Sequence, residues 1–184
     1  MMEDKDTILM IIDIQERLIK SIQNKDAIVF NISKLIDTVN LLSIPKFFSE
    51  QNPLKLGNTL GSLPRSQQDI IASKMHFSCI NCGELNKLIN GKNYKNLLLC
   101  GIETHVCVQQ TAIDFINQGL NVFIAMDAVG SRNNLDHQVA LRRIESAGGI
   151  ISTTESIIFE WCKSAQRAEF RNLSEIIKRE RPDT

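Results

Sequence analysis

The chain of 184 residues is 43% hydrophobic and 23% charged, and its 21 basic and 21 acidic side chains give a formal net charge of zero. This length predicts one domain with a substantial core, and the balanced charge does not favour electrostatic binding to nucleic acid or membranes. The polar start MMEDKD and the lack of an apolar run near the roughly 18–20 residues of a membrane span argue against a secretory signal or a membrane protein. Five cysteines at irregular spacing fit reduced thiols better than a disulfide framework, so we expect a cytoplasmic protein without nucleic-acid or membrane partners.

Short apolar runs alternate along the chain with segments that repeat apolar residues every three or four positions. The runs predict buried strands, and the repeats predict amphipathic helices. We expect strands at 7–14, 44–49, 69–73, 95–102, 120–126 and 150–153. We expect helices at 26–42, 81–90 (opened by a capping box from Asn81 to Glu84), 104–118, 135–147, 154–162 and 168–179. The alternation predicts a single α/β domain over 1–184 with a mainly parallel sheet, an irregular excursion at 51–68 and a C-terminal helical tail from about 163.

Four polar side chains stand at or just after predicted strand ends, where mainly parallel sheets bind their ligands. Asp13 ends a buried run, where an unpaired charge is costly, but it could also be a turn residue. Lys74 follows the weak third strand and, taken alone, could be a solvated surface lysine. Cys107 falls in the first turn of a predicted helix, where the helix dipole is expected to lower the pKa of a thiol, although free cysteines are more often core residues. For Asp127, a structural turn carboxylate is the commoner explanation.

The remaining cysteines and histidines give weaker signals. Cys79 and Cys82 form a C-x-x-C pair before a helix, as in a dithiol redox site, but coincidence is the better explanation in a chain with five cysteines. A zinc site would need a second pair of similar spacing, which the other cysteines do not supply. Cys100 lies within a buried strand and is expected in the core. His105 is two residues from Cys107 and would point to another side of the helix, so it is not an obvious base for that thiol.

Several ordered motifs resemble the isochorismatase-like cysteine hydrolase family. They are IIDIQERL around Asp13, SEQNPLKLG from Ser49, SKMHFS around Lys74, CGIETHVCVQQTAIDF around Cys107, and DAVGSRNNLDHQVALRRIESAGGIISTTES from Asp127. The resemblance runs from about Thr7 to Trp161 and is greatest to the branch of isochorismatase-domain-containing proteins.

The resemblance implies a three-layer α/β/α sandwich with a six-stranded, mainly parallel sheet. It also implies a catalytic triad, which falls on Asp13, Lys74 and Cys107. The family has a cis peptide before the nucleophile loop, which here would join Ile102 to Glu103. Backbone N–H groups of Glu103 and Cys107 would then form an oxyanion hole.

In the chemistry that follows from this resemblance, Asp13 takes the proton of Cys107, Lys74 stabilises the thiolate, and the thiolate attacks an amide, carbamoyl or related carbonyl. Relatives that hydrolyse nicotinamide bind a metal through a histidine-containing motif between the aspartate and the lysine. Here Glu50 and Gln51 stand in that stretch, and the first histidine comes after Lys74. We therefore expect no metal and no other cofactor.

Substrate identity is not determined by the sequence, but specificity is expected to lie in the excursion at 52–68 and in a few side chains near the site. Those side chains are Gln15, Arg17, Glu50, Phe77 and His105. Family members are usually oligomers, so we expect a homo-oligomer, with the apolar helices near the C-terminus as one candidate interface. Two other functions remain open: a thiol-redox protein that uses Cys79 and Cys82, and a non-catalytic scaffold of the same fold.

Overall fold

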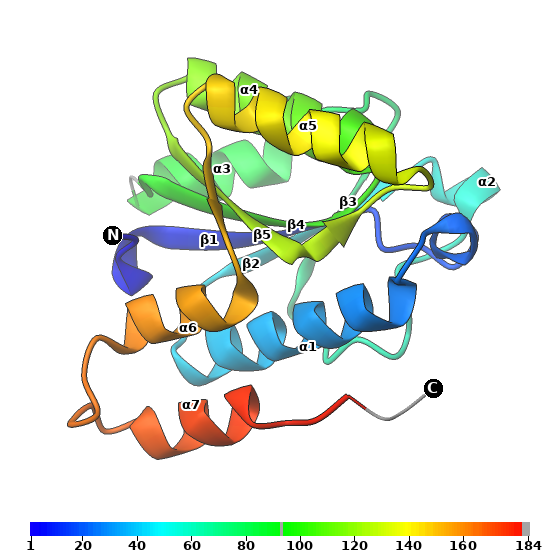
Figure 1. Ribbon diagram of the computed structural model, residues 1–184. Helices are drawn as coiled ribbons and strands as arrows, with labels where there is room; N and C mark the ends of the chain where they lie inside the picture. Colours follow the sequence, from blue (N-terminus) through cyan, green and yellow to red (C-terminus); the bar gives the residue numbers. More distant parts are fainter. Residues whose placement is uncertain (93, 182–184) are drawn as a thin grey trace.

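The computed structural model describes residues 1–92 and 94–181 (Figure 1). Its centre is a six-stranded sheet in the order β3-β2-β1-β4-β5-β6, in which every neighbouring pair is parallel. The strands are β1 (Thr7–Ile12), β2 (Lys46–Gln51), β3 (Ile70–Lys74), β4 (Asn96–Ile102), β5 (Asn121–Gly130) and β6 (Ile150–Ser152). The larger helices are α1 (Lys25–Leu41), α3 (Gly83–Lys92), α4 (Gln109–Asn117), α5 (Asn134–Ser146), α6 (Thr154–Cys162) and α7 (Phe170–Ile177). The short elements are η1 (Asp4–Asp6), η2 (Ile19–Ser21), α2 (Pro53–Leu56) and η3 (Thr104–Val108).

Two apolar cores lie on opposite faces of the sheet, because successive side chains of a strand point to opposite faces. In β1, Leu9 and Ile11 pack on one face with α1 and α6, while Ile8, Met10 and Ile12 pack on the other with α3, α4 and α5. All six residues of β1 are buried, as the continuous apolar run predicted. Figure 1 shows the resulting three layers, with α3, α4 and α5 above the sheet and α1 and α6 below it. The predicted three-layer α/β/α sandwich is therefore confirmed.

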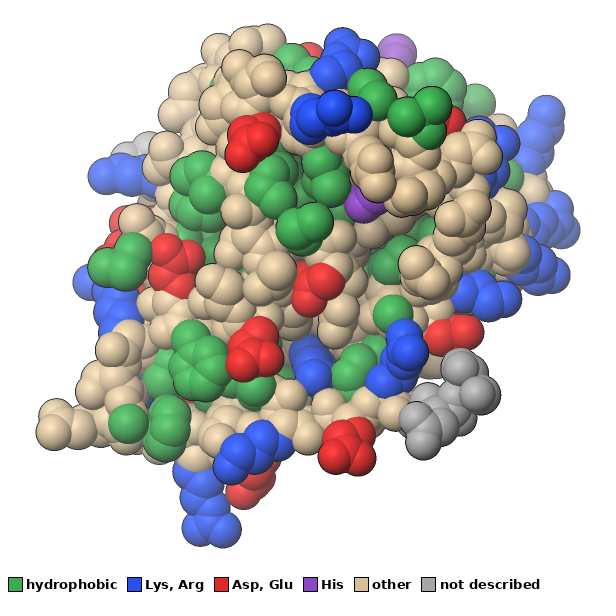
Figure 2. Space-filling view, in the orientation of Figure 1, with side chains coloured by type: hydrophobic (Ala, Val, Ile, Leu, Met, Phe, Trp, Pro, Cys, Tyr) green, Lys and Arg blue, Asp and Glu red, His purple; other side chains and the backbone are tan. Residues whose placement is uncertain are grey.

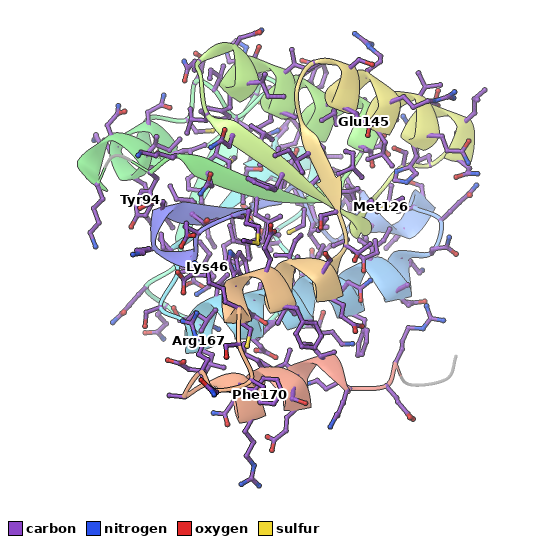
Figure 3. The ribbon with its side chains drawn as sticks, turned by 60° about the vertical axis from the view of Figure 1, so that its left-hand side comes forward. Lys46, Tyr94, Met126, Glu145, Arg167 and Phe170 are labelled. Carbon is purple, nitrogen blue, oxygen red and sulfur yellow. The ribbon has the colours of Figure 1, made fainter. Side chains whose placement is uncertain are left out.

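The C-terminal helix α7 forms an extra layer outside α1 and α6 (Figure 1). Its Leu173 and Ile176 pack against Ile158 and Cys162 of α6 in a third apolar cluster. Figure 3 shows the turn into this helix, with Arg167 and Phe170 below α6. The apolar side of α7 thus packs within the chain, and the expected homo-oligomer with an interface near the C-terminus stays a prediction. No helix among the described residues has both the length and the apolarity needed to cross a membrane.

The six parallel strands all point the same way, so their carboxyl ends share one edge of the sheet. Figure 3 shows this polarity: Lys46 at the start of β2 and Tyr94 just before β4 lie on one side, and Met126 in the later part of β5 lies on the other. The order of strands reverses between β1 and β4, which are direct neighbours. Such a reversal opens a crevice at the carboxyl ends, so this is where a ligand is expected.

Three expected elements differ from the structure in their bounds or form. The strand predicted at 120–126 continues to Gly130, because its register with β4 shifts and β5 bulges between Ile124 and Val129. The helix predicted at 81–90 begins at Gly83, so Asn81 lies outside it and the expected capping box does not form. The helix predicted at 104–118 opens with the wider π-helical turn η3 before it becomes regular in α4.

Gly101 is the residue that lets β4 approach β1 closely just before the strands end. Its φ is +138°, and an added Cβ would lie 2.2 Å from the carbonyl oxygen of Ile12. That oxygen belongs to the backbone and cannot move aside without displacing β1. Only glycine fits at this position. The position lies directly beside Asp13, the residue that follows β1.

We predict that Gly101→Ala lowers the free energy of unfolding by about 3 kcal/mol or more, because both the backbone conformation and the contact with Ile12 become unfavourable. Gly91→Ala is the matched control, since Gly91 lies within α3 and its added Cβ would meet nothing within 4 Å. That control should be neutral or stabilising by up to about 1 kcal/mol. Urea unfolding followed by circular dichroism measures both, and equal stabilities for the two variants would contradict the close-approach argument.

Candidate active site

Asp13 is the first residue after β1 and occupies the centre of the carboxyl edge. Its φ of +53° turns the chain sharply at the end of the strand, and its side chain is only 1% exposed. Ser49 of β2 fixes it twice: the Asp13 N–H donates to the Ser49 carbonyl at 3.1 Å, and the Ser49 hydroxyl donates to Oδ1 at 2.7 Å. A buried carboxylate in a strained turn, held by a neighbouring strand, is typical of a functional position.

Lys74 reaches Asp13 from the edge strand β3, across the intervening strand β2. Its Nζ donates to Asp13 Oδ2 at 2.7 Å, to Gln51 Oε1 at 2.9 Å and to the Phe77 carbonyl at 2.9 Å. These three bonds use all three N–H donors of the ammonium. Because neighbouring strands are about 4.8 Å apart, a side chain that spans β2 must be long, and lysine meets that requirement.

The ammonium of Lys74 stays charged although its side chain is only 4% exposed. Burial by itself lowers the pKa of Lys74, but the negative charge of Asp13 and the hydrogen bond to it act in the opposite direction, and the net shift is upward. The folded protein therefore holds this proton more tightly than the unfolded chain. The resulting contribution to stability is present at neutral pH and is lost only as the pH rises into the alkaline range of the folded pKa.

Cys107 completes the cluster from the other side of the strand reversal. It lies in the π-helical turn η3 after β4, it is 4% exposed, and its thiol is close enough to the Asp13 carboxylate and the Lys74 ammonium for both to shift its pKa. The structure thus brings together all three residues of the expected triad. Two of them come from one half of the sheet and Cys107 from the other half.

The expectation of a lowered thiol pKa at Cys107 was wrong. Burial raises the pKa of Cys107 strongly, the Asp13 charge raises it further, and the opposing effect of Lys74 is smaller. The sequence argument considered the helix start and Lys74 but could not include desolvation by the surrounding core. The protein at neutral pH therefore holds a Cys107 thiol beside an Asp13–Lys74 ion pair.

The expected cis peptide between Ile102 and Glu103 is also absent, since no peptide bond in the described part of the chain is cis. The chain instead breaks at this point because Glu103 adopts the left-handed region, with φ 57° and ψ 59°. A trans bond avoids the roughly 3–4 kcal/mol cost of a cis non-proline peptide, and the left-handed residue supplies the turn. Backbone N–H groups at the start of a helix have no partner earlier in that helix, so Glu103 and Cys107 remain the oxyanion-hole candidates.

The side chain of Glu103 belongs to a polar cluster beside the triad. Arg132 Nε donates to Glu103 Oε1 at 3.1 Å, and His105 Nδ1 lies 3.5 Å from Glu103 Oε2 and 3.0 Å from the Ser131 hydroxyl. His105 thus faces the loop after β5, which agrees with the expectation that it is not a base for Cys107. The cluster ties the π-helical turn η3, which contains Cys107, to the loop after β5.

The other expected substrate-binding residues lie near the site, but two of them already have protein partners. Gln15 donates to the carbonyls of Gln51 at 3.0 Å and Gly57 at 2.6 Å, and its Oε1 accepts from the Gln51 N–H. Glu50 Oε1 accepts from the N–H and hydroxyl of Thr59. These bonds give both residues a framework role, which holds the excursion after β2 against the sheet.

Two further side chains expected near the site are more accessible. Phe77 is 51% exposed, although its carbonyl accepts from Lys74. Arg17 donates from Nη1 to the Lys55 carbonyl at 2.6 Å and so braces the short helix α2. That Phe77 and Arg17 contribute to substrate recognition stays a prediction.

Sequence reasoning missed Ser49 and Gln51 as members of the site. Both lie on β2 between Asp13 and Lys74, and each hydrogen-bonds one end of that pair. A usable signal was present, because Ser49 and Gln51 are two residues apart near the end of a buried strand and so point to the same face. Their partners could not be identified without knowing that β2 lies between β1 and β3.

Asp127 and Cys100 have the structural roles that the sequence favoured. Asp127 Oδ1 accepts from the N–H and hydroxyl of Thr154 at 2.8 and 2.9 Å, which fixes the start of α6. Cys100 is fully buried in β4. Within residues 1–92 and 94–181, no group of three or more histidine, cysteine or acidic side chains is arranged to hold a metal ion.

The fold is an α/β/α sandwich with polar side chains gathered at the carboxyl edge of its parallel sheet, and comparison with known proteins identifies its family. The isochorismatase domain model matches residues 7–156. The chain therefore belongs to the isochorismatase family, as the sequence motifs indicated.

Similar proteins occur in distant eukaryotes. The chain is 38% identical over 181 residues to isochorismatase family protein 1B of Dictyostelium discoideum, covering 95% of this chain and 87% of that protein. It is 35% identical over 179 residues to isochorismatase domain-containing protein 2A of Mus musculus, covering 97% and 85%. Among solved structures, that of the MAR1 ribonuclease from Caenorhabditis elegans matches with a TM-score of 0.91 at 34% identity, covering 100% of this chain and 95% of the other.

We predict that Lys74→Met lowers the free energy of unfolding by about 3–5 kcal/mol, because it leaves the buried Asp13 carboxylate without its cation. The double variant Asp13→Asn/Lys74→Met should be more stable than Lys74→Met alone, since it removes the uncompensated charge. Arg171→Met is the control for loss of one positive charge: Arg171 pairs with Glu175 on the surface, and its loss should cost less than about 0.5 kcal/mol. Denaturant unfolding measures all three, and a Lys74→Met protein as stable as the control would show that the ion pair contributes little.

We also predict that alkylation of Cys107 is slow at neutral pH and keeps accelerating above pH about 9, where an ordinary thiol of pKa about 8.5 is already mostly ionised. Because the pKa of Cys107 is raised, the reactive thiolate stays rare until the solution is alkaline, and the labelling rate therefore rises with pH over that range. Iodoacetamide labelling with peptide mapping measures the profile, and the same chain in urea supplies the reference profile. A plateau of the Cys107 rate below pH about 8 would contradict the prediction.

Proposed function

We propose that this protein is a cysteine hydrolase that cleaves the C–N bond of a small amide, carbamoyl or related compound. The observation that carries the proposal is the Cys107 thiol beside the buried Asp13–Lys74 ion pair, close enough for both charges to shift its pKa. A thiol is a poor nucleophile until it loses its proton, and a carboxylate in contact with it can take that proton.

In the first chemical step, Asp13 accepts the proton of Cys107 while the sulfur attacks the substrate carbonyl carbon. The carbonyl π electrons move to oxygen, and the oxyanion binds to the backbone N–H groups of Glu103 and Cys107. Lys74 holds the Asp13 carboxylate in place through Oδ2 and balances the negative charge of the thiolate as it forms. The Ser49 hydroxyl donates to the other oxygen, Oδ1, and so keeps the Asp13 carboxylate from rotating.

In the second step, protonated Asp13 gives its proton to the leaving nitrogen, the C–N bond breaks, and an amine or ammonia departs. The acyl or carbamoyl group then remains on Cys107 as a thioester or thiocarbamate. Asp13 next takes a proton from water, the resulting hydroxide attacks the same carbonyl, and Cys107 leaves with the proton. Each cycle returns the thiol and the ion pair to their starting state.

Burial of the nucleophile favours a small substrate. Cys107 is 4% exposed, so a bulky polymer could not bring its backbone to the sulfur without rearrangement of the site. The net charge of zero gives no general attraction for nucleic acid, and on the face in Figure 2 acidic side chains occur among the basic ones. The Caenorhabditis elegans relative is named a ribonuclease. For this protein, cleavage of RNA is therefore the less favoured candidate activity.

The test is a panel of small amides, ureas and carbamates, with release of ammonia or amine as the readout and an RNA oligonucleotide as a separate arm. We predict turnover of at least one C–N compound, reduced about a thousandfold or more in Cys107→Ala and about tenfold or more in Lys74→Met. Mass spectrometry of the intact chain during turnover should show the acyl group on Cys107. Cys162→Ala is the matched control, since Cys162 is another buried cysteine that packs against α7, away from the site.

The outcomes separate the candidate functions. Turnover that survives Cys107→Ala would rule out this nucleophile, and activity on RNA alone would replace the proposed substrate class. A folded protein with no turnover on the whole panel and no adduct on Cys107 would favour the scaffold alternative.

A further inference from the structure

Cys79 and Cys82 lie together in a tight turn between β3 and α3. The N–H of Cys82 donates to the carbonyl of Cys79 at 3.0 Å, which closes a four-residue turn. In such a turn the first and last Cα atoms lie within about 7 Å, a separation close to that which a disulfide spans. α3 begins at Gly83, and the N–H of Asn86 donates to the Cys82 carbonyl, so Cys82 immediately precedes the helix.

The two cysteines of this turn differ in burial and in the direction of their pKa shifts. Cys79 is fully buried and Cys82 is 6% exposed. The hydrogen bond from Cys79 lowers the pKa of Cys82 against the effect of burial, whereas the same bond and burial raise the pKa of Cys79. A more exposed sulfur with thiolate character beside a buried partner is the arrangement of an attacking and a resolving cysteine.

Cys79 also contacts the groups that hold the triad. Its thiol is close enough to the Ser49 side chain and to Lys74 for both to lower its pKa. Its N–H donates to the Thr111 hydroxyl at 3.0 Å, on the helix that follows Cys107. Two residues before it, the Phe77 carbonyl accepts from Lys74 Nζ. A change at Cys79 therefore acts on both ends of the Asp13–Lys74 pair.

We propose that Cys79 and Cys82 form a reversible disulfide that lowers the reactivity of Cys107. The inference goes beyond the proposed hydrolase activity, because the disulfide and its effect on the Cys107 thiol are measured without any substrate. The C-x-x-C pair, for which the sequence alone favoured coincidence, is then a site of reversible oxidation.

The oxidant we propose is hydrogen peroxide, whose size suits a partly buried thiolate. The Cys82 thiolate attacks one peroxide oxygen, the O–O bond breaks, and the departing hydroxide takes a proton to give water. Cys82 is then a sulfenic acid, and the Cys79 sulfur attacks it, forms the S–S bond and releases a second water as its own proton is lost. Overall, two thiols lose two electrons and two protons, and one peroxide becomes two waters.

The disulfide changes the site by moving the Cys79 sulfur toward Cys82 and away from Ser49. Ser49 is the residue that fixes Asp13 Oδ1, and the turn that contains Cys79 follows the carbonyl that fixes Lys74. Movement of this turn shifts the Phe77 carbonyl and draws the Lys74 ammonium away from Cys107, which weakens the charge that lowers the pKa of the Cys107 thiol. The expected result is a Cys107 thiol that loses its proton less readily.

The experiment has two arms. In the first, a Cys107→Ala chain is treated with peroxide, so that oxidation of Cys107 cannot interfere, and its intact mass and a non-reducing peptide map are measured. We expect loss of two hydrogen atoms, one peptide pair joined through Cys79 and Cys82, and reversal by dithiothreitol. Adding Cys82→Ser should abolish the mass change, whereas adding Cys162→Ser should not.

In the second arm, wild-type protein is oxidised, freed of peroxide and labelled at Cys107 with iodoacetamide. We expect labelling to slow by about tenfold or more, the change that one pKa unit produces, and to recover after dithiothreitol. Cys82→Ser protein should label at the same rate before and after oxidation. Two free thiols at Cys79 and Cys82 after oxidation would overturn the site, and a disulfide that leaves Cys107 labelling unchanged would overturn its effect on the nucleophile. Neither result bears on whether the reduced protein is a hydrolase.

Discussion

The buried ion pair between Asp13 and Lys74 is the interaction on which the rest of the site depends. Two charges with side chains 1% and 4% exposed are tolerated only because each has further partners. Ser49 satisfies one oxygen of Asp13, while Gln51 and the Phe77 carbonyl satisfy the remaining donors of Lys74. The end of β2 and the turn after β3 are therefore parts of the site as well as parts of the fold.

This ion pair also affects the protonation state of Cys107. Burial and Asp13 together keep Cys107 protonated, and in the proposed mechanism the same carboxylate removes that proton when a carbonyl carbon is presented. A resting thiol is protected from alkylation and oxidation, which require thiolate. By contrast, Cys82 has a lowered pKa, and its partner Cys79 lies against Ser49. Cys82 is thus connected to Cys107 through Cys79 and the residues that hold the ion pair.

Much of the fold could be predicted, because strands and helices leave patterns among residues that are close together in the sequence. Buried parallel strands appear as continuous apolar runs, and helices that cover a sheet repeat apolar residues at helical spacing, so the alternation of elements was readable from 7–14 to 168–179. The errors came where tertiary contacts override local pattern. The bulge in β5 carried that strand past Met126 to Gly130, and the start of α3 at Gly83 excluded the expected cap at Asn81.

By itself, the sequence determined the family, the alternation of elements and the strand-end positions of Asp13, Lys74 and Cys107. These follow from motifs and periodicity, which are properties of neighbouring residues. Only the tertiary structure decided what those residues do to one another, because strand order sets which side chains meet. It placed Ser49 and Gln51 between Asp13 and Lys74, turned the chain at Glu103 through a left-handed residue in place of a cis bond, and buried Cys107 deeply enough to raise its pKa. Desolvation and hydrogen bonding across strands depend on the assembled sheet, and no local pattern records them.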